Sequence, residues 1–185
     1  LNFVKRDGVI KCSYAASCSA TSWTFDLIDK CKPLAQSFKG LSVRERDLVE
    51  FCKENLGCTA QHVLDPTLLL DKEDFLAVVN SSVKNNPVIF SYILDKTPEK
   101  ELIIKKITEY YGIPVAWVNA KKSYYKRNDI DINDCIFPSV DEWINNLNNA
   151  AFVVTDSFHG VAMSIVFKKP FVVIQAQNGK FEVKT

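Results

Sequence analysis

Several short motifs that identify large enzyme classes are missing from this sequence. The six glycines form neither a G-x-x-x-x-G-K-[ST] phosphate loop nor a G-x-G-x-x-G dinucleotide fingerprint. Ser157 lies in T-D-S-F-H rather than in the G-x-S-x-G elbow of α/β-hydrolases. The six cysteines form no C-x-x-C pair, and there are only two histidines. These absences argue against nucleotide binding through those loops, against a serine hydrolase and against a zinc site.

Long apolar runs and an excess of one charge are missing as well. No apolar run approaches the roughly 20 residues that span a bilayer, and the first residues lack the apolar stretch of a signal peptide. The net charge is only +1, so we expect no nucleic-acid partner. Without a secretion signal, the cysteines are expected to be reduced thiols. We therefore expect a cytoplasmic protein.

The sequence does contain a regular alternation of short apolar stretches and amphipathic stretches. The former predict strands and the latter helices, which together indicate parallel α/β layers. The polar segment 80–87 is the best candidate for a linker. We therefore predict two Rossmann-like halves, residues 1–82 with three strands and residues 83–185 with four. The main predicted helices are 23–37, with a restart at Pro33, and then 45–56, 72–79, 98–111 and 139–149.

The segment 150–174 is the most informative part of the sequence. It holds two strand-like runs around a helical run, and the first strand is joined to the helix by Thr155-Asp156-Ser157-Phe158-His159-Gly160. Ligands of open α/β sheets bind at the carboxyl ends of strands, where helix N-termini favour anions. His159, next to Gly160 and in one turn with Asp156, could therefore act as a general acid or base. The alternatives are a partly buried histidine without a function and three polar residues that only cap the helix.

A second strand-to-helix junction carries Arg44 and Arg46. A guanidinium at this position can bind a phosphate or carboxylate through two parallel hydrogen bonds. Arg46 stands four residues before Glu50, a spacing that favours a surface ion pair. Arg44, directly at the end of the strand, is the better candidate for a ligand-binding residue. The basic and aromatic segment 121–127 is interpreted as a solvated loop.

Four short segments occur in the order in which a known enzyme family has them. They are 14–17 (YAAS), 42–45 (SVRE), 63–70 (VLDPTLLL) and 155–160 (TDSFHG). Through them the chain resembles the polysaccharide pyruvyl transferase family, especially its bacterial branch, over nearly its whole length. The resemblance implies two Rossmann-like domains in a glycosyltransferase-B-like arrangement. It also implies transfer of the pyruvyl group from phosphoenolpyruvate to a pair of sugar hydroxyls in bacterial surface polysaccharide synthesis, which requires no metal and no tightly bound cofactor.

The resemblance further implies partners and site residues. The partners would be phosphoenolpyruvate and a sugar or lipid-linked oligosaccharide acceptor, which would bring the protein to the inner face of the membrane. The donor would lie in the cleft between the two halves. His159 would be the catalytic acid or base, and Asp156 would orient it or cap the helix. The substrates would contact Ser17, Arg44, Glu45, Thr155, Ser157, Phe158 and Gly160.

The sequence departs from this family in two respects. Relatives begin with a further strand and loop and end with closing helices, so we expect this chain to be a fragment. Many relatives carry a basic residue where this chain has Ser157. Arg44, Lys168 or Lys169 would then have to compensate, or the branch uses a different donor or acceptor. The alternative functions are a glycosyltransferase with a sugar-nucleotide donor and a non-catalytic sugar-binding fragment.

Overall fold

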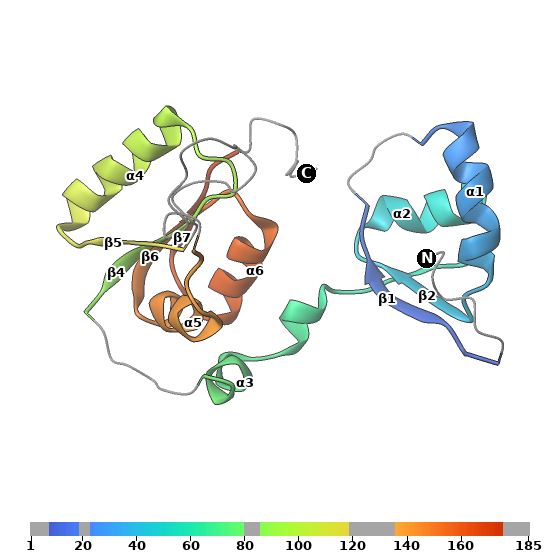
Figure 1. The fold of residues 1–185 in the computed structure, drawn as a ribbon, viewed down its shortest axis with the longest axis horizontal. Coiled ribbons are helices and arrows are strands. Elements are labelled where there is room, and N and C mark those ends of the chain that lie inside the picture. The colour runs from blue at the N-terminus through green and yellow to red at the C-terminus, as the bar shows by residue number, and fades with distance from the viewer. Residues whose placement is uncertain (1–7, 19–22, 80–85, 119–135, 176–185) are drawn as a thin grey trace. The chain divides into compact units, whose positions relative to one another are not determined.

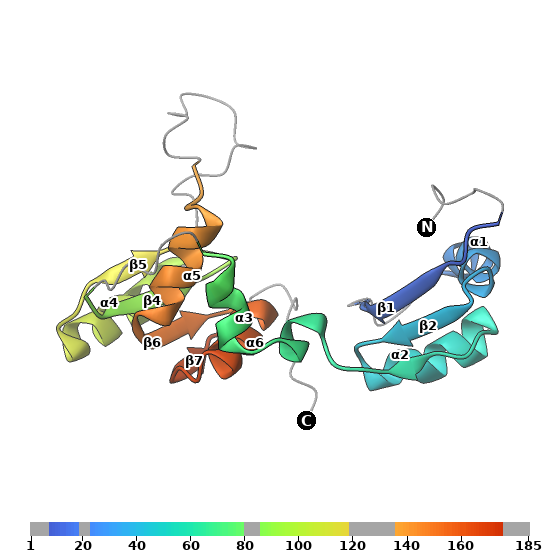
Figure 2. The same ribbon diagram turned by 90° about the horizontal axis from the view of Figure 1, so that it is seen from below.

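The computed structural model describes residues 8–18, 23–79, 86–118 and 136–175. Contacts divide the chain into two compact units, Leu1–Leu69 and Leu70–Thr185, and each unit contains one parallel sheet with helices (Figures 1 and 2). The predicted boundary between residues 82 and 83 lies outside the described residues and stays a prediction. The segment 121–127 lies outside them as well. No helix within the described residues has both the length and the apolar character to cross a bilayer.

The first unit contains a sheet in which three strands lie in the order β1-β2-β3 among the described residues, all parallel. Its helical elements pack together around a small core that includes Val43, Cys52 and Leu56. Its elements are β1 (Cys12–Ala16), α1 (Phe25–Gln36), β2 (Gly40–Val43), α2 (Arg46–Phe51), a π-helical turn (Cys52–Leu56), β3 (Gln61–His62) and a 3-10 turn (Pro66–Leu69).

The second unit contains a larger sheet with strand order β5-β4-β6-β7, again parallel throughout the described part. The prediction of two α/β halves with parallel sheets of three and four strands is therefore confirmed. Its elements are α3 (Lys72–Ala77), β4 (Val88–Tyr92), α4 (Pro98–Tyr111), β5 (Val115–Trp117), α5 (Val140–Asn148), β6 (Ala150–Thr155), α6 (Phe158–Val166) and β7 (Phe171–Val173).

Alternating side chains of the central strands build a separate core on each face of the larger sheet. Ile89 of β4 and Val154 of β6 pack with Ile104 of α4 on one face. Phe90 and Val153, their neighbours in the chain, pack toward α5 and α6 on the other. Figure 1 shows α4 on one side of this sheet and α5 and α6 on the opposite side. The two central strands are therefore buried on both faces, which explains their nearly continuous apolar sequence.

Local capping chemistry sets most helix boundaries where the sequence predicts them. Asp71 forms a capping box with Asp74 at the start of α3. Helix α4 begins after the N-cap Thr97 and ends at Gly112, whose φ of 65° is left-handed. The Ser139 side chain accepts a hydrogen bond from the Glu142 backbone N–H at 3.1 Å and so caps α5.

Two helix predictions need correction. Helix α1 does not restart at Pro33 but continues through it. Proline removes one helical hydrogen bond, to the carbonyl of Asp29, and water can satisfy that carbonyl because Asp29 is exposed. The helix predicted for 45–56 is helical over most of that range but changes to π-helical geometry at Cys52. As predicted, it ends at Gly57, with a left-handed φ of 63°.

Candidate functional site

The carboxyl end of β6 lies near the middle of the larger sheet. Its last residue, Thr155, pairs with Tyr92 of β4 on one side and with Val173 of β7 on the other. The buried Thr155 hydroxyl donates a hydrogen bond to the Tyr92 carbonyl at 2.7 Å and accepts one from the Ser157 N–H at 3.0 Å. Because the strands are parallel, the loop after β4 and the turn after β6 meet at one edge. The Thr155 hydroxyl thus connects the end of β4 to the start of the turn that carries the predicted site residues.

The Asp156 side chain is fully buried and holds two segments of this edge together. Its carboxylate accepts hydrogen bonds from the backbone N–H groups of Leu94 at 2.6 Å and Asp95 at 3.1 Å, and from Lys100 Nζ at 2.8 Å. Lys100, 4% exposed in its side chain, also donates to the Asp95 carbonyl at 2.8 Å. Charge-assisted bonds of this kind are what a buried carboxylate requires. These contacts bind the loop after β4 to the turn after β6, and the catalytic role predicted for Asp156 stays a prediction.

His159 stands in the first turn of α6 with an exposed side chain. Its ring meets the Phe158 ring edge-on, with 5.4 Å between the centroids. Ser157 occupies the N-cap position but makes no side-chain capping hydrogen bond, and the first turn contains no acidic residue. The N-terminus of a helix carries a positive partial charge. An anion at this turn would therefore meet the helix dipole and the imidazole, while the neighbouring Asp156 carboxylate is buried in its bonds to Leu94, Asp95 and Lys100.

Gly160 allows α6 to pack closely against the end of β6. A Cβ atom at this position would lie 2.1 Å from Thr155 Oγ1 and 2.8 Å from Thr155 Cβ. Both distances are far below van der Waals contact, so only glycine fits without a shift of the helix or the strand. The Gly160 carbonyl also accepts a hydrogen bond from the buried Ser164 hydroxyl at 2.6 Å. Gly160, predicted as a substrate-binding residue, thus has a structural reason to be glycine.

The first unit brings together the three site residues predicted in that half. Arg44 donates from Nη2 to Ser17 Oγ at 2.8 Å and from Nε to Glu45 Oε1 at 3.2 Å, and the Ser17 hydroxyl donates to Glu45 Oε1 at 2.7 Å. Arg44 also donates from Nη1 to Asp65, whose other carboxylate oxygen accepts from the Thr67 N–H at 2.9 Å. All lie just beyond the carboxyl ends of β1, β2 and β3. We call Ser17, Arg44, Glu45 and Asp65 the arginine network.

The charges in the arginine network shift two pKa values in opposite directions. Burial alone would lower the pKa of Arg44, but its hydrogen bonds to Asp65 and Glu45 outweigh this and raise it. Burial would raise the pKa of Asp65, but the hydrogen bonds from Arg44 and Thr67 lower it overall. The network thus holds one guanidinium between two carboxylates, and a substrate anion at Arg44 would have to compete with them.

One carboxylate oxygen of the arginine network accepts no hydrogen bond from the described residues. The Glu45 Oε2 atom is buried and has no hydrogen-bond partner among the described residues. Buried polar atoms are nearly always hydrogen-bonded. A substrate hydroxyl could satisfy this oxygen, whereas an anion could not.

The structure adds Lys100 and Asp65 to the residues predicted from the sequence. Lys100 lies in the first turn of α4, the helix that follows β4, and this position is the only, weak signal that the sequence contained. Lys168 and Lys169, considered as substitutes for the missing base, follow the C-terminal end of α6. They are separated from His159 by the length of α6, about 13 Å for nine residues. Lys169 Nζ donates to the Asn148 carbonyl at 2.6 Å, which gives this lysine a structural role.

A comparison with models of protein families agrees with the resemblance seen in the sequence. A family model described as "Polysaccharide pyruvyl transferase" matches residues 3–178. No curated protein and no solved structure matches the chain. The match to the family model spans both sheets and includes the arginine network and the turn that carries His159. The chain belongs to the polysaccharide pyruvyl transferase family.

Proposed function

We propose that this protein transfers the pyruvyl group of phosphoenolpyruvate to two hydroxyls of a sugar in bacterial surface polysaccharide synthesis. Family membership supports the transferase class, and the exposed His159 at the N-terminus of α6 is the observation that carries the chemistry. In the overall reaction, two sugar oxygens bond to the central carbon of the donor and its bond to the phosphate oxygen breaks. One hydroxyl proton ends on the methylene carbon, which becomes the methyl group of the ketal, and the other leaves with inorganic phosphate.

The turn after β6 is the part of the site suited to the anionic donor. The α6 dipole and the backbone of its first turn favour a phosphate or carboxylate. Ser157, whose hydroxyl makes no capping bond, can donate to a phosphate oxygen in place of the base that many relatives have. His159 either protonates the enol carbon or removes a proton from the attacking hydroxyl. Asp156 positions this turn through its bonds to Leu94, Asp95 and Lys100.

The arginine network is better suited to a sugar than to a second anion. It carries two carboxylates for one guanidinium, so its net charge would repel phosphoenolpyruvate unless a carboxylate moved. The unpaired Glu45 Oε2 and the Ser17 hydroxyl are groups that hydrogen-bond to sugar hydroxyls. We therefore assign Ser17 and Glu45 to the acceptor, with Arg44 holding both in place.

The proposal is tested by release of inorganic phosphate from phosphoenolpyruvate over a panel of free and lipid-linked sugars. Wild-type protein should release phosphate only when an acceptor is present. His159→Gln should reduce kcat by roughly 100-fold or more, as expected for loss of general acid–base catalysis. Tyr110→Ala, an 85% exposed aromatic residue near the C-terminal end of α4, is the control and should leave kcat unchanged.

Two results would contradict this proposal. One is full phosphate release by a folded His159→Gln protein, which would remove the catalytic role of the histidine. The other is release of a nucleoside diphosphate from a sugar nucleotide without turnover of phosphoenolpyruvate, which would identify a glycosyltransferase instead. Circular dichroism of each variant establishes that the fold is intact.

A further inference from the structure

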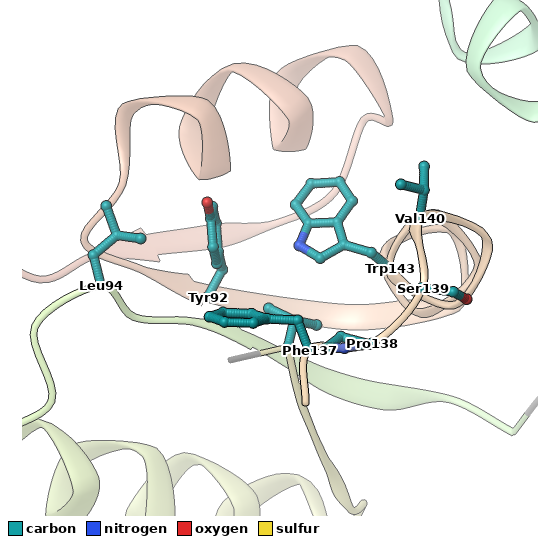
Figure 3. A pocket seen from close by; sticks show the side chains of 8 residues that line it. Tyr92, Leu94, Phe137, Pro138, Ser139, Val140 and Trp143 are labelled. Atoms are coloured by element: carbon teal, nitrogen blue, oxygen red, sulfur yellow. The ribbon is translucent and has the colours of Figure 1, made fainter. Parts of the chain in front are cut away.

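An aromatic pocket lies at the same edge of the larger sheet as the His159 turn. It has a volume of about 360 Å³, within the range of small-ligand sites. Figure 3 shows the rings of Tyr92, Phe137 and Trp143 on its walls. The pocket is formed where β4 and β5 end and α5 begins, and its lining is Tyr92, Leu94, Val118, Phe137, Pro138, Ser139, Val140 and Trp143.

The lining of this pocket suits a neutral ligand with one apolar face. Among the residues that the structure describes, no charged side chain lines the pocket, and these residues offer an anion such as phosphoenolpyruvate no charge to compensate for the loss of its hydration. The Tyr92 and Trp143 rings stand almost perpendicular, with centroids 5.6 Å apart. Within the described residues, neither the Tyr92 hydroxyl nor the Trp143 indole N–H has a hydrogen-bond partner in the protein. Aromatic faces with a few polar groups match the C–H face and the hydroxyls of a sugar ring.

The walls of the pocket are bonded to the turn that carries the candidate catalytic histidine. The Tyr92 carbonyl accepts hydrogen bonds from Thr155 Oγ1 at 2.7 Å and from the Asp156 N–H at 3.4 Å. The Leu94 N–H donates to Asp156 Oδ1 at 2.6 Å. Both the pocket and the turn belong to the second unit. Hydrogen bonds within that unit alone therefore connect the walls of the pocket to the turn that carries His159.

We propose that this pocket is an acceptor subsite that binds a neutral sugar ring of the acceptor against Tyr92, Phe137 and Trp143. The assignment rests on the proposed function for the identity of the acceptor, but binding of the sugar can be measured without the reaction. The chemistry of this subsite is aromatic, whereas that of the arginine network is charged.

The test is saturation-transfer NMR with the methyl glycosides of glucose, galactose and mannose as probes. Wild-type protein should transfer saturation to the ring C–H protons of at least one glycoside. Phe137→Ala removes a ring that is 65% exposed and should weaken binding by roughly 3- to 10-fold, the range of an aromatic contact. Tyr92→Phe removes only the hydroxyl and should weaken it by roughly 3- to 10-fold, the value of one hydrogen bond. Tyr110→Ala is the matched control and should bind like wild type.

The outcomes separate this proposal from the proposed function. Absence of binding of all three glycosides to wild-type protein, or unchanged binding by Phe137→Ala and Tyr92→Phe, overturns the acceptor subsite even if phosphoenolpyruvate is turned over. Loss of binding in both variants supports the subsite even if no phosphate is released. In the transferase assay, the same variants should raise KM for the acceptor and leave KM for phosphoenolpyruvate unchanged. A raised KM for the donor would instead place phosphoenolpyruvate in the pocket and overturn the assignment.

Discussion

The buried ion pair between Lys100 and Asp156 should contribute strongly to the unfolding free energy of the second unit. Replacing Lys100 with methionine keeps the length and apolar stem of the side chain but removes the ammonium 2.8 Å from Asp156 Oδ2. The Asp156 carboxylate, with 0% side-chain exposure, would then keep only the N–H groups of Leu94 and Asp95. Breaking a buried pair on one side typically costs about 3–5 kcal/mol, because it leaves an uncompensated charge. We expect Lys100→Met to destabilise the second unit by that amount.

Urea unfolding of four proteins measures this effect and its cause. The set consists of wild type, Lys100→Met, Asp156→Asn and the double variant, followed by far-UV circular dichroism. The double variant removes both charges, so its loss of unfolding free energy should be smaller than the sum of the single losses by roughly 1–3 kcal/mol. Lys105→Met on the same helix is the control. Its lysine is 72% exposed in the side chain and pairs with Glu109 at 3.8 Å.

Two results test the role of the buried pair: the stability of Lys105→Met and the difference between the double variant and the sum of the single variants. Exposed i,i+4 pairs contribute only about 0.3–0.5 kcal/mol, so Lys105→Met should behave almost like wild type. A loss below about 1 kcal/mol in Lys100→Met would fall outside the range for a broken buried pair and would refute the description of Lys100 and Asp156 as such a pair. Strictly additive losses in the double variant would refute it as well.

Three further predictions concern single residues. Gly160→Ala places a Cβ 2.1 Å from Thr155 Oγ1 and should lower the unfolding free energy in urea by about 1–3 kcal/mol, whereas Gly40→Ala, whose Cβ would meet its nearest atom at 3.5 Å, should lower it less. The pKa of Asp65 is lowered in the folded state. The contribution of this residue to stability is therefore complete above the unfolded pKa of about 4 and is lost as pH falls through the lower folded value. Asp65→Asn should make the unfolding free energy depend less on pH in this acidic range, and an unchanged pH dependence would contradict this. Ser91→Ala removes a buried hydroxyl that has no partner among the described residues and should leave stability unchanged or raise it by about 1 kcal/mol, so a loss of that size in thermal unfolding would contradict it.

Local chemistry made much of the fold predictable from the sequence. The boundaries of α4 follow from Thr97 and Gly112, and the start of α3 follows from Asp71, because a cap depends only on residues within one turn. The parallel sheets follow from the alternation of apolar and amphipathic stretches. Strand β3 (Gln61–His62) is harder to predict, because both of its side chains are exposed and no apolar pattern marks it in the sequence.

Long-range pairing explains what the sequence did not reveal at the candidate site. The turn with His159 was identified from its place between a strand and a helix. Lys100, whose ammonium group pairs with Asp156 of this turn, lies 56 residues before Asp156 in the chain. No periodicity in the sequence connects these two residues. The partnership of Arg44 with Asp65 spans 21 residues and was missed for the same reason. The sequence shows Arg44 at the end of a strand, a position that favours anion binding, but only the structure shows that Asp65 accepts a hydrogen bond from this guanidinium.

The central claim is that this protein moves a pyruvyl group with the help of His159. The most direct measurement is to run the reaction of phosphoenolpyruvate with an acceptor sugar in deuterium oxide and to analyse the product by NMR and mass spectrometry. Because the methylene carbon of the donor takes up one proton to become the ketal methyl group, the account predicts a product with one deuterium in that methyl group, and almost no product from His159→Gln. A phosphorylated sugar, a glycosylated product, or equal yields from wild type and His159→Gln would contradict it.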